Sequence, residues 1–375
     1  SVKPFSTEPP SVKPSSAKPL KSSSKLKQKL KLKSSVRSKP TIPLSGRKIT
    51  TVQEELENRK NLAENESEYN FLYPNLNDPD FNIKIAERKE FYDTKYDGKI
   101  ANIETEAERL CSAEFELAPH QLFVRNFMSA QTPYNSLLLY HGLGTGKTCS
   151  AIGVAEEMRD YLKQMGMMER IIVVATPNVQ NNFRLQLFDE NKLKLIDGLW
   201  NIRACTGNKY LKEINPMNMK GLPKEKVVKQ INRLINNSYL FLGYVEFANY
   251  INKKSNITGD ITDPAKLKKL QRQKLKRFFN NRLIIIDEVH NIRITDDNKD
   301  KRIAIELSKL IRNVDFVRLL LLSATPMYNS YKEIVWLINL MNMNDNRPSI
   351  EIKNVFNANG TFKTDNDGNE IGREL

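Results

Sequence analysis

The feature that most constrains the fold of this chain is a glycine-rich segment, HGLGTGKT, at residues 141–148. It follows an apolar run at 136–140 and precedes a helix-compatible segment at 149–162. A strand, a glycine-rich turn and a helix N-terminus form a cradle for phosphate, because backbone N–H groups and the helix dipole both favour an anion there. Glycines let the backbone approach the phosphates without an intervening side chain. The segment therefore predicts a nucleotide-binding loop.

Two residues of this loop have specific expected roles. Lys147 is expected to reach the β- and γ-phosphates and to take part in catalysis, and the Thr148 hydroxyl to bind Mg²⁺. The strict phosphate-loop pattern has a glycine five positions before Gly146, where this chain has His141. A glycine-rich turn without a ligand is the alternative at this point. The residues expected to bind the nucleotide are His141, Gly142, Gly144, Thr145, Gly146, Lys147 and Thr148.

A second candidate motif, DEVH, follows the apolar run at 283–286. Four branched aliphatic residues are typical of a buried strand. Adjacent carboxylates at its end are costly to bury unless a cation or hydrogen bonds compensate them. We expect Asp287 to hold Mg²⁺, Glu288 to orient and deprotonate the attacking water, and His290 to sense the γ-phosphate.

A third candidate motif, Ser323-Ala324-Thr325, follows the apolar run at 319–322. Its small hydroxyl residues can hydrogen-bond the acidic motif and relay the state of the nucleotide. Ser-Ala-Thr alone is a common turn. Its place after the other two motifs favours the coupling role for Ser323, Ala324 and Thr325.

From about residue 111 onward, short apolar runs alternate with amphipathic segments. This alternation predicts an α/β fold with a mostly parallel sheet and helices on both faces. Ligands bind such sheets at the carboxyl ends of the strands, where all three motifs fall. The expected strands are 136–140, 171–175, 202–205, 239–242, 283–286 and 319–322, and the expected helices are 149–162, 180–188, 224–235, 245–251, 266–279, 303–311 and 331–341.

The first part of the chain has a different composition. Residues 1–48 hold 13 of the 59 Lys and Arg residues and one of the 44 acidic residues, so they carry +12 of the net +15. This Ser-, Lys- and Pro-rich segment is expected to be disordered. It could attract nucleic-acid phosphates, or act as a solubilising tail or nuclear-import signal. Residues 49–110 are expected to form an N-terminal extension containing the aromatic residues Tyr69, Phe71, Tyr73 and Phe81.

Several other classes of function are disfavoured. No apolar run approaches the ~18 residues of a membrane span, and no signal-peptide pattern is present. The three cysteines, Cys111, Cys149 and Cys205, show no metal or disulfide spacing, which fits a reducing compartment. The three histidines also lack metal-ligand spacing, although each lies within a nucleotide motif.

A basic segment at 266–277, KLKKLQRQKLKR, is not part of any of these motifs. Leu267, Leu270 and Leu275 give it a narrow apolar stripe surrounded by basic residues. A solvated helix face is one interpretation. Contact with a nucleic-acid backbone or with a polymerase subunit is the alternative.

Together these residues resemble the motifs of superfamily 2 helicases. GTGKT at 144–148, DEVH at 287–290 and SAT at 323–325 resemble motifs I, II and III. The resemblance implies that Gln121 in LAPHQ reads adenine, and that Thr176 and Pro177 (motif Ia) and Gly243 (motif Ib) contact the nucleic-acid backbone. The amino-acid sequence of residues 117–341 resembles those of the helicase-like ATPases of nucleocytoplasmic large DNA viruses. This group includes the poxvirus early transcription factor small subunit and nucleoside triphosphatase I.

The resemblance implies a RecA-like ATP-binding domain at 111–345 and the start of a connector or second domain at 346–375. It implies ATP and Mg²⁺ as cofactors, ATP hydrolysis of the DEAD/DEAH-like type, and coupled movement on DNA or RNA. Motifs IV to VI are absent, so a second RecA-like domain with an arginine finger is expected beyond Leu375, and this chain alone is expected to be weakly active. The alternatives are an ATPase subunit of a viral transcription factor that works with RNA polymerase without processive unwinding, and a non-enzymatic scaffold. The expected location is inside the host cell or in the virion, without membrane attachment.

Overall fold

The computed structural model describes residues 73–96, 116–142, 144–258, 262–292, 302–327, 332–357 and 359–364, together with residues 102, 104, 105 and 108. These residues belong to one compact unit, Tyr69–Leu375. The expected basic tail at 1–48 and much of the expected extension at 49–110 lie outside the described residues. Among the helices that are described, none combines the length and the apolar character needed to cross a membrane.

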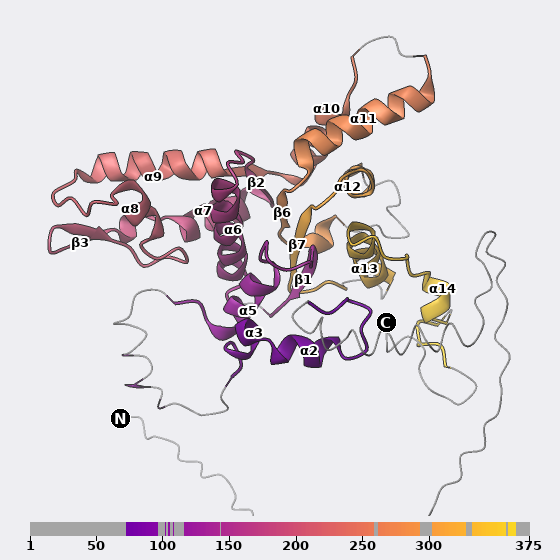
Figure 1. Ribbon diagram of the computed structural model, residues 1–375, viewed down its shortest axis with the longest axis horizontal. Helices are drawn as coiled ribbons and strands as arrows, with labels where there is room; N and C mark the ends of the chain where they lie inside the picture. The colour runs from indigo at the N-terminus through magenta and orange to yellow at the C-terminus, as the bar shows by residue number, and fades with distance from the viewer. Residues whose placement is uncertain are drawn as a thin grey trace, which may run out of the picture. The chain divides into compact units, whose positions relative to one another are not determined.

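A five-stranded sheet forms the centre of the fold (Figure 1). All of its neighbouring strands pair in parallel, so their carboxyl ends share one edge. This confirms the predicted parallel α/β architecture, and the strands correspond to five of the expected segments. In spatial order they are β1 (Ser136–Tyr140), β7 (Arg318–Ser323), β6 (Leu283–Ile286), β2 (Ile171–Val174) and β5 (Tyr239–Leu242).

The register of the strands aligns the segments that follow them. Tyr140 of β1 pairs with Ser323 of β7, and Ile286 of β6 pairs with both Leu321 of β7 and Val174 of β2. The phosphate-loop segment, the acidic motif and the Ser-Ala-Thr segment therefore all start at the same edge of the sheet. This is the edge at which open α/β sheets bind ligands.

Helices cover both faces of the sheet. The evidence is that alternate residues of each strand pack in two different apolar clusters. Val173 and Ile285 pack in one cluster, while Ile172 and Ile284 pack in the other. Alternate strand residues point to opposite faces, so each cluster marks one face. The first face is covered by α5 (Pro119–Phe127), α6 (Lys147–Gln164), α7 (Pro177–Leu187) and α9 (Lys224–Ser238), and the second by α10 (Tyr244–Ser255), α11 (Pro264–Phe279), α12 (Arg302–Asn313) and α13 (Lys332–Asn344).

Two short helices, α2 (Phe81–Glu87) and α3 (Lys89–Tyr92), precede this core. The rings of Phe81 and Tyr73 lie edge-on to the buried Tyr134 ring, with centroids 5.5 and 5.9 Å away. The Tyr134 hydroxyl donates a 2.8 Å hydrogen bond to Pro74 O. Tyr73 and Phe81 thus pack on the core as expected, whereas Tyr69 and Phe71 lie outside the described residues.

The predicted strand at 202–205 is wrong. The segment forms turns instead, and its apolar residues are buried without strand pairing. Asn208 Oδ1 accepts a 2.9 Å hydrogen bond from Ile202 N, and the Thr206 hydroxyl donates to Leu187 O at 2.9 Å. A separate antiparallel pair lies just before it, formed by β3 (Lys194–Ile196) and β4 (Leu199–Asn201) between the short helices η1 (Glu190–Lys192) and α8 (Lys209–Ile214).

A disulfide joins Cys149 near the start of α6 to Cys205 in this turn, with 5.2 Å between their Cα atoms. The cysteine spacing had given no indication of a disulfide, so this pair was not expected from the sequence. The two residues are 56 positions apart, and only the packing of the turn against α6 brings them together.

Near the C-terminal end of the described residues, α14 (Ile352–Val355) precedes an isolated antiparallel bridge between Phe356 and Phe362.

Candidate nucleotide-binding site

The phosphate-loop segment connects β1 to α6. Gly144 and Gly146 adopt φ angles of +80° and +79°, in the left-handed region that favours glycine. Gly146 is the N-cap of α6, and a Cβ atom on it would lie only 2.5 Å from Gln121 Nε2. The backbone conformation of this loop thus favours glycine at both positions, and the close approach of Gln121 adds a steric reason at Gly146.

The side chain of Lys147 folds back over the loop. Its ammonium group donates hydrogen bonds to His141 O at 2.8 Å and Gly142 O at 3.0 Å. The Thr145 hydroxyl also donates to Gly142 O, at 2.9 Å. Thr148 lies half-buried in the first turn of α6. One cation and the exposed amide end of a helix therefore meet at the loop, which is the combination that binds phosphate.

Helix α5 supports the loop from one side. The amide of the buried Gln121 accepts a 3.0 Å hydrogen bond from Ala118 N and donates a 3.3 Å bond to Gly146 O. His120 Nε2 donates to Thr145 O at 3.1 Å. Burial and the neighbouring His120 lower the pKa of His141, and Lys147 lowers it further. The neutral form of His141 is therefore favoured, and its ring contacts that of His120 edge-on, with the ring centroids 5.7 Å apart.

The acidic motif begins directly after β6. Burial raises the pKa of Asp287 to about 6, against the effect of a 2.9 Å hydrogen bond from Glu288 N, and the Glu288 carboxylate adds to the rise. The Lys147 ammonium acts in the opposite direction, so the two candidate catalytic segments are close enough to interact. Glu288 has a φ of +46°, an unfavourable conformation for a residue with a side chain.

His290, the last residue of the acidic motif, contacts the Ser-Ala-Thr segment. Its Nδ1 atom is 3.3 Å from Glu288 Oε2 and 3.1 Å from Ser323 Oγ. Ser323 is fully buried, and its hydroxyl accepts a 3.0 Å hydrogen bond from Thr325 N. The segments at the ends of β6 and β7 are thus joined by the His290–Ser323 contact as well as by the backbone hydrogen bonds between the two strands. Ala324 and Thr325 contribute backbone to this turn.

The candidate nucleic-acid residues lie farther along the same edge. Thr176 and Pro177 begin α7 after β2, and Gly243 begins α10 after β5. The Gly243 N–H donates a 2.8 Å hydrogen bond to Glu246 Oε2. Next to it, the Tyr244 hydroxyl donates to Asp287 O at 2.8 Å. This tyrosine directly follows Gly243 in the segment that resembles motif Ib, and its hydroxyl links that segment to the acidic motif.

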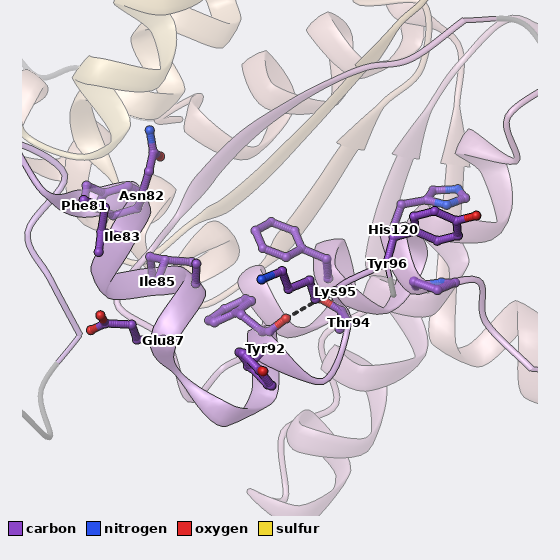
Figure 2. Close-up of a pocket in the computed structure, with 14 residues that line it drawn as sticks. Phe81, Asn82, Ile83, Ile85, Glu87, Tyr92, Thr94, Lys95, Tyr96 and His120 are labelled. Carbon is purple, nitrogen blue, oxygen red and sulfur yellow. Dashed lines mark hydrogen bonds between the residues drawn. The ribbon is translucent and has the colours of Figure 1, made fainter. Parts of the chain in front are cut away.

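A pocket of about 890 Å³ lies between α2, α3 and the start of α5 (Figure 2). Tyr92, Tyr96 and Phe123 line it, together with His120, which also contacts the loop. The Thr94 hydroxyl in its wall donates to Phe91 O at 2.7 Å. Its volume falls in the range of small-molecule sites, and its walls come largely from the segment before the predicted domain.

The expected site residues thus fall into two groups. The loop, the acidic motif and Ser323 lie together at the β1–β7–β6 side of the edge, whereas Thr176 and Gly243 follow β2 and β5. Gln121 contacts the loop backbone through its side-chain amide. His120 and Tyr244 lie in segments that resemble helicase motifs, but their hydrogen bonds to Thr145 O and Asp287 O were not expected, because bonds to distant backbone carbonyls leave no pattern in a sequence.

The sequence is similar to those of several viral proteins. A "Putative ATP-dependent RNA helicase" of Acanthamoeba polyphaga mimivirus is 26% identical over 291 residues, which are 72% of this chain and 23% of that protein. A second mimivirus protein of the same designation is 27% identical over 74% of this chain and 40% of its own length. The "Nucleoside triphosphatase I" of Heliothis armigera entomopoxvirus is 24% identical over 64% of this chain and 29% of its own length. The chain therefore spans well under half the length of these relatives.

The family model described as "Type III restriction enzyme, res subunit" matches residues 114–328, which are more than half of the chain. The match begins shortly before α5 and ends just after the Ser-Ala-Thr segment, so it contains the phosphate loop, the acidic motif and every strand of the main sheet. The chain belongs to this family, whose helicase-like domain is that of the superfamily 2 ATPases.

Proposed function

We propose that this chain binds ATP and Mg²⁺ at the described edge of the sheet and hydrolyses ATP, as the first RecA-like domain of a nucleic-acid helicase or translocase. One observation carries the proposal. A cationic loop at a helix N-terminus, two adjacent carboxylates and a histidine–serine pair meet at the ends of β1, β6 and β7. Phosphoryl transfer needs a phosphate cradle and an oriented water, and these groups can supply both.

Each group has a role that its surroundings allow. Lys147 would exchange its bonds to the His141 and Gly142 carbonyls for bonds to the β- and γ-phosphate oxygens. Glu288 would accept a proton from the attacking water, since it is the more exposed carboxylate of the pair. His290, which contacts both Glu288 and Ser323, would respond to the γ-phosphate and transmit its presence to β7.

The donor set fits Mg²⁺. Asp287 is a buried carboxylate whose ionised form is disfavoured by burial and by Glu288, and a hard cation would relieve both effects. Asp287 and the Thr148 hydroxyl would hold the ion. When bound, Mg²⁺ neutralises charge on the β- and γ-phosphates.

The pocket beside His120 is the place for the nucleotide base. His120 in its wall also bonds Thr145 O of the loop, and its aromatic walls would offer surfaces on which a base can stack. Gln121, expected to read adenine, would do so from α5 while keeping its bond to Gly146 O.

The remaining assignments rest on the relatives, most of whose length lies outside the aligned region. Residues 111–345 would be the first RecA-like domain, and a second such domain would supply an arginine that stabilises the transition state. Such an arginine is worth ~10³–10⁵ in rate, so this chain alone should turn over slowly. Thr176, Pro177 and Gly243 would contact the backbone of DNA or RNA.

A role with viral transcription machinery is the second candidate. An African swine fever virus relative is named "Early transcription factor large subunit homolog". Strand displacement by a polypeptide that includes both domains would separate the two candidates, because a transcription subunit would show ATPase activity without it. Either function would place the protein inside the host cell or in the virion.

Nucleotide binding and phosphate release by three variants test the proposal. Lys147→Ala should weaken binding of a fluorescent ATP analogue at least ~10-fold, because the cation that binds the phosphates is removed. Glu288→Gln should keep binding and lower turnover ~100-fold or more. Lys163→Ala, at the exposed end of α6, is the control and should change neither. Undiminished turnover in Glu288→Gln would contradict the assignment.

A further inference from the structure

Helix α11 carries charge of one sign only. Its 16 residues, Pro264–Phe279, include seven Lys or Arg residues and no acidic residue. The apolar Leu275 and Phe279 are buried, and both lie near its C-terminal end. The basic residues are Lys266, Lys268, Lys269, Arg272, Lys274, Lys276 and Arg277.

The first ten residues of α11 extend past the helix on which it packs. α10 and α11 lie side by side and run antiparallel, since Lys254 lies 4.1 Å from the Phe278 ring and Lys274 Nζ donates a 2.8 Å bond to Asn256 O. Asn256 is the first residue after α10, so residues 264–273 have no part of α10 beside them (Figure 1). At 1.5 Å per residue this overhang is about 15 Å long.

The charges of the overhang are not used in folding. Lys266, Lys268, Lys269 and Arg272 are exposed, and none makes an ion pair with another residue of the described ranges. Lys268, Arg272 and Lys276 are spaced four residues apart and repel one another along one side of the helix. Of these three, Lys276 alone forms an ion pair within the described residues, with Asp315. Like charges at this spacing make the helix less stable than one with mixed charges.

We infer that the overhang of α11 binds the phosphate backbone of the nucleic-acid track, at a contact separate from Thr176, Pro177 and Gly243. The inference rests on the proposed function and deepens it. Cations on several sides of an exposed helix suit a polyanion, since they release its condensed counterions without needing a fixed geometry. A protein partner would need apolar or aromatic anchors, and none of the exposed large hydrophobic residues in the described part of the chain lies on α11.

Two charge-reversed proteins test this surface. The first is Lys268→Glu with Lys269→Glu and Arg272→Glu, in the full chain. The control is Lys224→Glu with Lys226→Glu and Lys229→Glu, three exposed residues of α9, which changes the net charge by the same amount. The control matters because residues 1–48 alone carry +12 and will attract nucleic acid wherever the other charges lie.

Fluorescence anisotropy with a labelled oligonucleotide should show at least a ~10-fold rise in Kd for the α11 variant. Its slope of log K against log salt should fall by about 2 to 3, which is about one for each phosphate that the variant no longer neutralises. The α9 control should stay within about twofold of the unaltered chain, and thermal melting should show that the α11 variant remains folded. Equal weakening of binding in both variants would overturn the inference, because total charge would then explain it.

A photo-cross-linker gives a local readout that the basic tail does not affect. Placed at the exposed Gln273 of α11, it should label the bound oligonucleotide, whereas the same group at the exposed Gln230 of α9 should not. Unaltered binding without cross-linking from Gln273 refutes the inference and leaves the proposed function intact. If the unaltered chain binds no oligonucleotide, both fail.

Discussion

The hydroxyl of Tyr244 donates a 2.8 Å hydrogen bond to the backbone carbonyl oxygen of Asp287. The two residues follow β5 and β6, which are not neighbours in the sheet because β2 lies between them. Asn291 Nδ2 also donates to this hydroxyl, at 3.4 Å. Tyr244 therefore connects the start of α10, where Gly243 is a candidate nucleic-acid contact, to the backbone of the acidic motif.

Replacing Tyr244 by Phe removes this connection and leaves the ring in place. Removing the donor to a buried acceptor costs about 1–3 kcal/mol. We expect the stimulation of ATPase activity by oligonucleotide to fall ~5-fold or more, with little change in the affinity for ATP. Tyr250→Phe, the same change on the same helix, is the control. Equal stimulation in the Tyr244→Phe protein and the unaltered chain would show that the hydrogen bond carries no signal.

The pair of His290 and Ser323 supports a second prediction. Ser323→Ala removes the hydroxyl that lies 3.1 Å from His290 Nδ1, and should lower kcat ~10-fold while KM for ATP stays within about twofold. The two side chains act together, so His290→Ala combined with Ser323→Ala should be no worse than His290→Ala alone. Rate reductions that multiply in the double variant would mean that the residues act independently.

Gly146 permits a test of the loop geometry. Gly146→Ala places a Cβ 2.5 Å from Gln121 Nε2 and forces alanine into a φ of +79°. We expect loss of nucleotide binding and a lower melting temperature, with a cost of at least ~1 kcal/mol from the φ angle alone. Adding Gln121→Ala removes the collision but not the strain, so it should restore stability only in part. Full restoration would mean that the φ angle is not a constraint.

The sequence predicts the parts of this fold that depend on local pattern. The run Leu283–Ile286 is continuously aliphatic and is a fully buried central strand, and the motif residues fall at strand ends as parallel topology requires. Apolar character alone does not distinguish a strand from a buried turn, and for this reason the segment at 202–205 was assigned wrongly. There, Asn208 Oδ1 accepts a hydrogen bond from Ile202 N and the Thr206 hydroxyl donates one to Leu187 O, in place of a strand ladder.

Contacts between distant segments could not be predicted in the same way. The site residues Lys147 and Asp287 were expected because each belongs to a motif, but the bond from Tyr244 to Asp287 depends on how two loops meet. The Cys149–Cys205 pair likewise depends on the packing of a turn against α6. Such contacts are properties of the folded chain and leave no spacing signal.

The disulfide leads to a prediction about stability. It closes a loop of 56 residues, for which chain entropy suggests about 4 kcal/mol, with engineered examples often giving less. Cys205→Ser, or reduction of the unaltered chain, should therefore lower the melting temperature by several degrees. Cys111→Ser is the control and should leave it unchanged. Thiol titration of the unfolded, unreduced chain should detect one free cysteine, and three would refute the pairing.

The last prediction concerns Glu156, a buried carboxylate on α6. It accepts 2.6 Å hydrogen bonds from the hydroxyls of Tyr210 and Tyr239, and it pairs with Arg159 and Lys209 at 2.8 and 3.0 Å. Burial acts to raise its pKa, but Lys209 and Arg159 outweigh burial and hold the pKa below its ordinary value of 4.5. The ionised form is thus favoured in the folded state and stabilises it.

Glu156→Gln should accordingly lower the free energy of unfolding by about 1–3 kcal/mol at pH 7. Arg159 and Lys209 each lose one of two carboxylate partners, and keep their ion pairs with Glu213 and Asp160. A carboxyl whose pKa is lowered on folding contributes its full stability above the unfolded pKa and loses it as pH falls through the folded value. The difference between the variant and the unaltered chain should therefore be constant from pH 7 to about 5 and shrink below pH 4.5. Denaturant titrations from pH 7 to below pH 4.5 measure this difference in the free energy of unfolding. Glu157→Gln, a neighbouring change outside the cluster, is the control. A difference that grows on acidification would show that Glu156 is protonated in the folded protein.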